Sequence, residues 1–310
     1  MPRPALAAVA AVALLAAGCG SATTHASPLT ITKPNPSNKL LQGKTRLEVT
    51  RIGSLPQAFS KAAAVALPHG RLMVLGGYTG SASLDTILAG APSRLRVVGH
   101  LPRPTHDATA AALGGSVYLF GGGESVSVPS VVRVDPRTGR SSQAPALGEP
   151  LSDLGAVAIG GRAYLVGGYT GTQFATAVLR YRPTTTIARL PTGTRYAGVT
   201  AIGRTIYVAG GLTTAGATRA VYAVSLGGGL RRIATLPRPE DHAALAALGG
   251  GLYLVGGRRV LAIDPKSGKV TTAARLPASV SDPTATTVGS RIVITGGGTK
   301  DVWAATLARA

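Results

Sequence analysis

The sequence predicts an all-β protein, a six-bladed β-propeller, because two markers recur along it with one period. Six Gly-Gly doublets end short apolar runs, and they begin at Gly76, Gly121, Gly167, Gly210, Gly256 and Gly296, which are 45, 46, 43, 46 and 40 residues apart. A leucine followed by proline, or once by glycine, recurs with nearly the same period at Leu55, Leu101, Leu147, Leu190, Leu236 and Leu276. Repeats of this length with strands that end in glycine are typical of propeller blades.

One repeat shows how a blade is built. Apolar runs predict strands over 108–113 and 116–120, and Gly114-Gly115 between them predicts a two-residue hairpin turn. A third strand is expected over 131–135. The turn Pro136-Arg137-Thr138-Gly139 then leads to a fourth strand, because proline presets one torsion and glycine accepts a positive φ.

The two ends of the chain complement each other. The last repeat has room for a third strand over 302–307 but not for a fourth, whereas residues 46–52 match a fourth strand without a preceding repeat. We therefore expect the N-terminal strand to complete the sixth blade of a propeller domain at 45–310. A ring closed in this way has no open first or last sheet edge. A closed ring needs no second copy to complete its sheets, so we expect a monomer.

The chain resembles bacterial kelch-repeat propellers of the galactose oxidase/kelch-like superfamily over residues 45–310. The resemblance is carried by the double glycines and by a tyrosine three residues before four of them, Tyr118, Tyr164, Tyr207 and Tyr253. Kelch repeats usually have a tryptophan in the fourth strand, but the chain has only Trp303, in the last repeat. The copper site of galactose oxidase requires a tyrosine cross-linked to a cysteine, but the one cysteine here, Cys19, precedes the propeller and belongs to an expected lipid anchor. No copper cofactor is therefore expected.

The N-terminus predicts export and a membrane anchor. Residues 1–18 combine Arg3 with a short apolar core, and the small residues before Cys19 resemble a bacterial lipoprotein signal, in which the cysteine is lipidated. The alternative is an ordinary cleaved signal peptide with an incidental cysteine. Residues 19–44 are rich in Ser, Thr, Pro and Asn and are expected to form a flexible tether. The predicted location is the cell membrane, lipid-anchored and extracytoplasmic.

The chain is strongly basic, with 32 Lys and Arg against 12 Asp and Glu, a formal net charge of +20. Basic surfaces can bind nucleic acid, but here the basic residues are scattered and an exported protein meets little nucleic acid. We expect no nucleic-acid partner. Affinity for anionic envelope polymers or lipid head groups, or a surface that only keeps the protein soluble, fits better.

The sequence contains no motif that identifies a reaction. It lacks metal-ligand spacing, a Gly-x-Ser-x-Gly elbow and a phosphate-binding loop with lysine. We expect no cofactor and no metal site, although closely spaced carboxylates could hold a hard cation.

Polar residues are expected to gather at one mouth of the central channel. Counting back 14 residues from each doublet reaches the position before the innermost strand: Ala62, Asp107, Asp153, Tyr196, His242 and Asp282. The residues just before these are Lys61, His106, Ser152, Arg195, Asp241 and Ser281. Four of the 12 acidic residues and two of the 5 histidines fall in this set, which predicts a polar binding mouth. Polar loops and Asp caps at turns would give the same pattern without a ligand.

Loop lengths predict an asymmetric mouth. The segment from doublet to turn aspartate spans 14 residues in the second repeat, Gly121 to Asp135, and 8 in the fifth, Gly256 to Asp264. The loops of the second, third and fourth blades, which include Glu124, Tyr169, Phe174 and Leu212, are therefore expected to wall the mouth. A ligand is expected to enter over the fifth and sixth blades. The predicted ligand-binding set is Lys61, His106, Asp107, Asp153, Arg195, Tyr196, Asp241, His242, Arg258 and Asp282.

Three functions are compatible with these features. The preferred one is a non-catalytic lipoprotein whose propeller face binds an envelope glycan or protein. The second is an enzyme that resembles kelch-type sialic acid epimerases, with His106, His242 or an aspartate moving a proton and Arg195 holding a carboxylate. The third is a scaffold that only docks neighbouring proteins.

Overall fold

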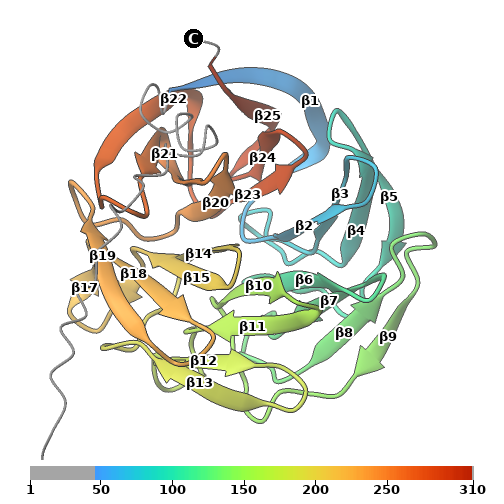
Figure 1. The fold of residues 1–310 in the computed structure, drawn as a ribbon. Helices are drawn as coiled ribbons and strands as arrows, with labels where there is room; N and C mark the ends of the chain where they lie inside the picture. The colour runs from blue at the N-terminus through green and yellow to red at the C-terminus, as the bar shows by residue number, and fades with distance from the viewer. Residues whose placement is uncertain (1–45, 309–310) are drawn as a thin grey trace, which may run out of the picture.

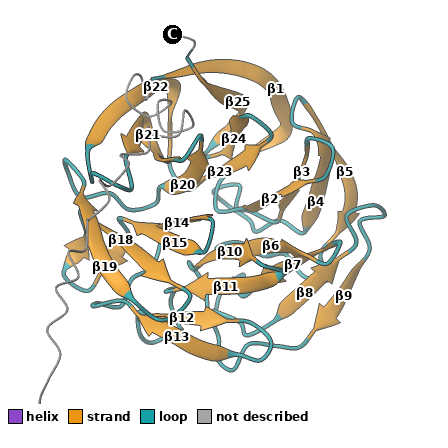
Figure 2. Ribbon diagram, in the orientation of Figure 1, coloured by secondary structure: helices purple, strands orange, loops and turns teal. Residues whose placement is uncertain are grey.

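The computed structural model describes residues 46–308, which form six blades around a central channel (Figure 1). All regular elements of these residues are strands, joined by loops and turns (Figure 2). The prediction of an all-β, six-bladed propeller is confirmed. Within 46–308 no helix is long and apolar enough to span a membrane. The expected signal, Cys19 and tether lie outside the described residues.

The first four blades are four-stranded antiparallel sheets with the innermost strand first. The first comprises β2 (Ala63–Leu67), β3 (Arg71–Leu75), β4 (Thr86–Ala91) and β5 (Arg94–His100). The second comprises β6 (Thr109–Leu113), β7 (Ser116–Phe120), β8 (Val131–Val134) and β9 (Ser141–Ala144). The third comprises β10 (Gly155–Ile159), β11 (Arg162–Val166), β12 (Ala177–Arg180) and β13 (Thr185–Arg189). The fourth comprises β14 (Gly198–Ile202), β15 (Thr205–Ala209), β18 (Ala220–Ser225) and β19 (Leu230–Thr235), with a small hairpin of β16 (Leu212–Thr213) and β17 (Gly216–Ala217).

The fifth blade has the order β20 (Ala244–Leu248), β21 (Gly251–Ile263) and β22 (Val270–Val280). The single strand β21 occupies the positions of both the second and third strands of other blades. Its first part pairs with β20 and its second part with β22. The long loop found between these two positions in the first four blades is therefore absent from this blade.

The sixth blade combines both ends of the chain. Its strands are β23 (Pro283–Val288), β24 (Arg291–Gly296), β25 (Thr299–Leu307) and the N-terminal β1 (Leu47–Phe59), in the order β1-β25-β24-β23. β1 runs antiparallel to β25, with Leu47 opposite Leu307 and Arg51 opposite Trp303. The expected closure by the N-terminal strand is observed, and β1 continues to Phe59, seven residues beyond the expected end at Ile52.

The double glycine is a clamp between neighbouring blades. In the second blade, Gly121 has a φ of 60°, and a methyl group on it would overlap the carbonyl oxygen of Leu151 in the third blade. The next residue, Gly122, donates its N–H to that same carbonyl at 2.8 Å. Only glycine combines this torsion with so close a backbone approach, which is the physical reason for the repeated doublet.

The same clamp recurs around the ring. The donors and carbonyls are Gly77 with Thr105, Gly168 with Thr194, Gly211 with Glu240 and Gly298 with Phe59, at 2.8–2.9 Å. In the fifth blade, Gly257 pairs with Val280 as part of the β21–β22 ladder. Five of the six junctions thus have a glycine N–H bonded to a carbonyl of the segment that leads into the next blade, and the corresponding pairing of the fifth blade lies within its own sheet.

The apolar core consists of six clusters, one at each junction between blades. Tyr118, Tyr164, Tyr207 and Tyr253, each from a second strand, are at most 8% exposed and each belongs to such a cluster. Trp303 is 1% exposed and packs between the fifth and sixth blades. The aromatic side chains therefore pack between sheets, where aliphatic residues complete the interface.

Substituting Gly121→Ala should destabilise the propeller strongly. The left-handed torsion costs about 1–2 kcal/mol with a Cβ, and the overlap with the Leu151 carbonyl adds about 1–3 kcal/mol. Chemical denaturation should therefore show a loss of about 2–5 kcal/mol, the sum of these two costs. Gly148→Ala is the matched control, because its methyl group would meet no atom within 4 Å. Equal stability of the two variants would contradict the clamp.

Candidate functional site

One residue in each blade adopts a left-handed backbone conformation at the channel mouth. These residues are Lys61, Asp107, Asp153, Tyr196, His242 and Asp282, with φ between 51° and 57°. Such torsions are uncommon without glycine, least so for Asp and His, and cost about 1–3 kcal/mol each. Six of them at equivalent positions show that the ring geometry, and not a local turn, imposes the conformation.

The sequence count was wrong for the first blade, where Lys61 and not Ala62 occupies this position. The hairpin between β2 and β3 has three residues, 68–70, whereas that between β6 and β7 has two, Gly114 and Gly115. The additional residue shifts the count by one. As a result, a cation lies in the ring where the count placed a methyl group.

A chain of backbone hydrogen bonds links these residues from blade to blade. Five of the six N–H groups donate to the carbonyl of the previous ring member: Asp107 to Lys61, Asp153 to Asp107, Tyr196 to Asp153, Asp282 to His242 and Lys61 to Asp282, at 2.8–3.1 Å. Between Tyr196 and His242 the two rings stack instead, with centroids 3.9 Å apart. Backbone hydrogen bonds thus join the left-handed residues around the axis at five of the six steps.

The side chains above this ring pair acids with bases. Lys61 Nζ lies 3.1 Å from Asp107 Oδ2, and His106 Nε2 lies 3.5 Å from the same oxygen. The other nitrogen of His106, Nδ1, hydrogen-bonds Ser83 Oγ at 2.8 Å. His106 is thereby held between a carboxylate and a hydroxyl.

Asp153 is the most buried acid of the mouth, with its side chain 1% exposed. Its Oδ2 lies 2.6 Å from Arg195 Nη2 and accepts a hydrogen bond from Ser152 Oγ at 3.0 Å. Its Oδ1 is buried and has no hydrogen-bond partner among residues 46–308. The Arg195 guanidinium also donates to Tyr196 Oη at 2.6 Å and lies 4.7 Å from the Tyr169 ring centroid, which fixes its position.

On the opposite side of the mouth, His242 and Asp282 form a close pair. His242 Nδ1 lies 2.5 Å from Asp282 Oδ1, and Ser281 Oγ donates to Asp282 Oδ2 at 3.2 Å. Tyr196 stacks on His242 from one side, and Lys61 Nζ lies 5.5 Å from the Tyr196 ring centroid. Tyr196 therefore connects the two acid–base groups of the mouth.

Burial changes the proton affinity of these groups. Burial, with the negative charge of Asp107 as the second cause, raises the pKa of Asp153 to about 6, although Arg195 opposes the rise. The pKa of Asp107 is also raised by burial, although Lys61 opposes this. Burial, followed by the charges of Asp107 and Asp153, raises the pKa of Tyr196 to about 12. Two interacting carboxyl groups are thus present, and one of them can exchange a proton near neutral pH.

Two cavities open at this mouth. A central one of about 100 Å³ is lined by all six left-handed residues and, beneath them, by small residues such as Ala62 and Ala108. A second one of about 350 Å³ lies beside it over the second and third blades and is lined by His106, Asp107, Ser152, Asp153, Arg195, Tyr169 and the loop 123–127. Asp107 and Asp153 line both cavities, so a ligand could reach them from either one.

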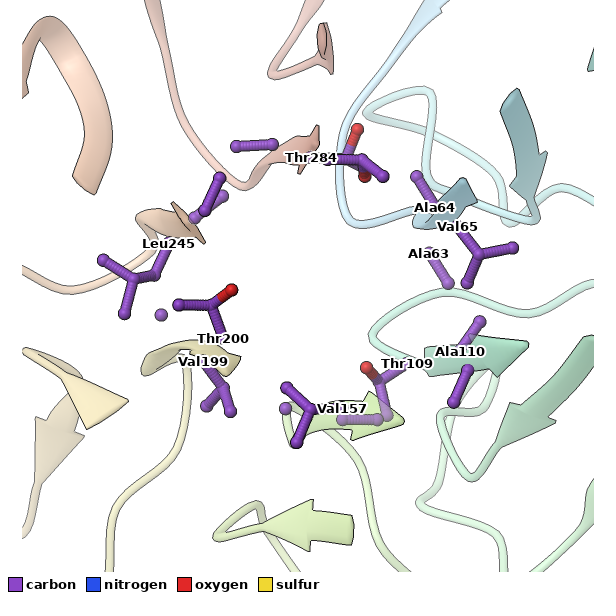
Figure 3. A pocket seen from close by; sticks show the side chains of 18 of the residues that line it. Ala63, Ala64, Val65, Thr109, Ala110, Val157, Val199, Thr200, Leu245 and Thr284 are labelled. Carbon is purple, nitrogen blue, oxygen red and sulfur yellow. The ribbon is translucent and has the colours of Figure 1, made fainter. Parts of the chain in front are cut away.

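The channel below the mouth has a different character. Its cavity of about 590 Å³ is lined by small apolar residues and threonines from the six innermost strands, among them Thr109, Val157, Thr200 and Thr284 (Figure 3). None of its lining residues is ionisable. The charged chemistry of the channel axis is thus confined to the mouth.

The structure brings together eight of the ten predicted site residues at these cavities: Lys61, His106, Asp107, Asp153, Arg195, Tyr196, His242 and Asp282. Asp241 and Arg258 line neither cavity. The Arg258 guanidinium instead donates to the carbonyl of Pro277 at 2.8 Å. Entry over the fifth and sixth blades stays a prediction, whereas the larger of the two mouth cavities lies over the second and third.

The side cavity is lined in part by loops that follow the double glycines. Glu124 and Tyr169 are among the loop residues expected to wall the mouth, whereas Ser127 was not predicted from the sequence. Ser127 Oγ lies 2.9 Å from Ser152 Oγ, which joins this loop to the ring. The expected long loops of these repeats were the available signal, but loop length alone does not identify the side chains that turn inward. Within residues 46–308 no group of three or more His, Cys, Asp or Glu is arranged to hold a metal ion.

These observations define a closed six-bladed β-propeller with a polar, mixed-charge mouth. No protein-family model and no curated protein matches the chain. The chain does resemble solved structures, among them the structure of YjhT, with a TM-score of 0.70, 15% identical residues, and coverage of 83% of this chain and 96% of YjhT. At this identity the similarity establishes the fold alone.

The pKa values of the two mouth histidines should be shifted in opposite directions. The hydrogen bond to Asp282 raises the pKa of His242 above 6.5, whereas burial lowers that of His106 below 6.5. Because the folded-state value is raised, His242 contributes stability that is fully present below pH 6.5 and is lost as pH rises through its folded pKa. NMR titration of the imidazoles should resolve the two, and Asp282→Asn should lower only the His242 value. One common pKa would contradict the pairing described here.

Proposed function

We propose that this chain is an extracytoplasmic kelch-type propeller, anchored through a lipid on Cys19, whose mouth binds a glycan of the cell envelope. The observation that carries the proposal is the convergence of half-buried acids, bases and hydroxyls from all six blades on one mouth. Sugars present many hydroxyl groups, and such mixed donors and acceptors suit them. A protein that presents the same polar groups from a loop is the alternative partner.

The mouth has the features of a preorganised binding site. Arg195 is held by Asp153 and Tyr196, and Lys61 is held by Asp107, so neither cation must be ordered when a ligand binds. The unpaired Oδ1 of Asp153 supplies an acceptor that a ligand hydroxyl can satisfy. Tyr169, with Phe174 at a ring-centroid distance of 5.8 Å, adds an aromatic edge to the side cavity.

The cellular setting rests on the sequence. The leader 1–18, the single cysteine at its end and the polar segment 19–44 support export, lipidation and tethering at the membrane surface. The acids at the mouth also argue against phosphate-backbone recognition there, so we propose no nucleic-acid partner.

A thermal-shift screen of the full chain against monosaccharides, sialic acids and cell-wall fragments tests the binding proposal. A ligand present at 100 times its Kd should stabilise the folded state by about 2.7 kcal/mol. His242→Ala removes a ring-stacking and ion-pairing group of the mouth and should weaken binding about tenfold or more, the loss expected for one charged hydrogen bond.

The matched control is His100→Ala. His100 also pairs with an aspartate, Asp85 at 3.1 Å, but it lies on the outer strand β5 and lines neither mouth cavity. Its removal should leave the ligand-induced shift unchanged. Equal shifts in the wild type and the His242→Ala variant would refute binding at the mouth, and no shift with any of the compounds would favour a protein partner.

A second candidate is acid–base catalysis on a small acidic sugar, as in kelch-type sialic acid epimerases. The specific observation that favours it is the adjacent pair of buried carboxyl groups, Asp107 and Asp153, of which Asp153 has a pKa raised to about 6. A carboxyl group of this kind can accept and return a proton near neutral pH. Arg195 would hold the carboxylate of the substrate.

The catalytic candidate predicts a measurable rate for anomer interconversion of N-acetylneuraminate followed by NMR. Asp153→Asn should reduce kcat/KM by about 100-fold or more, since the variant can no longer accept a proton. The rate of the wild type should fall as pH drops below about 6, where Asp153 becomes protonated. Asp85→Asn, just before β4 and outside both mouth cavities, should retain full activity. Binding without any rate enhancement would leave the glycan-binding proposal intact and reject catalysis.

A further inference from the structure

We propose that the face opposite the mouth carries a second binding site, an arginine-lined groove that takes a phosphate-bearing ligand. The groove lies between the second and third blades and has a volume of about 530 Å³. It is lined at the hairpin turns that follow β6 and β10, at the far ends of the innermost strands from the mouth ring. It is therefore a separate site and does not depend on the function proposed for the mouth.

Three guanidinium groups converge on this groove. Arg133 comes from β8 of the second blade, whereas Arg162 begins β11 and Arg182 follows β12 in the third. All three side chains are exposed, and none forms an ion pair with a residue in 46–308. No Asp or Glu lines the groove. Three cations without a local counter-charge create a site that an anion can neutralise.

The arginines are oriented by the groove itself. Arg133 Nε donates to Ser116 Oγ at 2.9 Å, and Ser116 is only 6% exposed. The Arg182 guanidinium lies 5.6 Å from the ring centroids of both Tyr118 and Tyr181. These contacts hold the guanidinium groups of Arg133 and Arg182 in place, which reduces the conformational entropy lost when a ligand binds.

The backbone of Arg182 supports a functional role for its side chain. Its φ is 58°, a torsion that arginine rarely adopts and that costs about 1–3 kcal/mol. The corresponding turns of the second and fifth blades have an aspartate that binds its own turn amides, Asp135 and Asp264. In the third blade Tyr181 takes the place of this aspartate and Arg182 follows it. This turn therefore has a positively charged side chain and lacks the carboxylate.

The geometry selects the ligand class. Guanidinium groups bind phosphate oxygens through paired N–H donors, and several arginines around one pocket suit a doubly charged or polyvalent anion. The tyrosine floor and the volume leave room for an organic group attached to the phosphate. The same chemistry is present in soluble phosphate esters and in phospholipid head groups.

Calorimetric titration of the full chain with inorganic phosphate and with glycerol phosphate, in chloride buffer of matched ionic strength, tests the soluble source. Co-sedimentation with phosphatidylcholine vesicles that contain or lack phosphatidylglycerol tests the lipid source. The groove variant is Arg162→Gln with Arg182→Gln, and the control with the same charge change is Arg94→Gln with Arg96→Gln on β5. All proteins share one N-terminus, so any membrane affinity of the leader cancels in the comparison.

We expect saturable binding of a phosphate-bearing probe that weakens about tenfold or more in the groove variant, the effect of losing charged hydrogen bonds, and stays unchanged in the control. Binding of the free phosphates identifies a soluble ester, and binding only to vesicles with phosphatidylglycerol identifies a lipid head group. Equal weakening in both double variants would show attraction by net charge alone and overturn the proposal, as would the absence of binding to every probe. Thermal melting followed by circular dichroism confirms that both variants are folded.

Discussion

The contact on which the remaining structure depends is the close approach of a double glycine to a carbonyl of the next blade. Gly122 donates to the Leu151 carbonyl, while the torsion and missing side chain of Gly121 make room for it. Leu151 lies two residues before Asp153, a left-handed residue of the mouth, and the other junctions repeat this offset. The clamp that joins the sheets therefore also places the residues that form the mouth.

The charge of the protein is distributed unevenly between its two faces. The mouth concentrates carboxylates beside Lys61 and Arg195, so that opposite charges are balanced at close range. The channel beneath it has no ionisable lining, and the charged residues that line the groove on the far side are all arginines. A ring of similar blades can thus present two chemically different surfaces, because the loops at the two ends of each strand vary independently.

The blades also differ around the ring. β21 is one continuous strand, so the fifth blade raises no loop beside the mouth, whereas the second and third blades contribute the loop 123–127 and Tyr169 to the side cavity. No such loop therefore lies beside the fifth blade, whereas Asp107 and Asp153 line the cavity that the loops of the second and third blades enclose.

The sequence by itself determined the number of blades, the closure by the N-terminal strand and most of the mouth, because the glycine torsion and close backbone approach recur in every repeat and leave a periodic signal. Tertiary structure decided the features that do not repeat from blade to blade. One additional residue in the first hairpin put Lys61 where counting placed Ala62, and Arg258 bonds Pro277 outside the mouth cavities. The groove likewise joins Arg133 and Arg182, 49 positions apart, through side-chain directions that only packing between two blades sets.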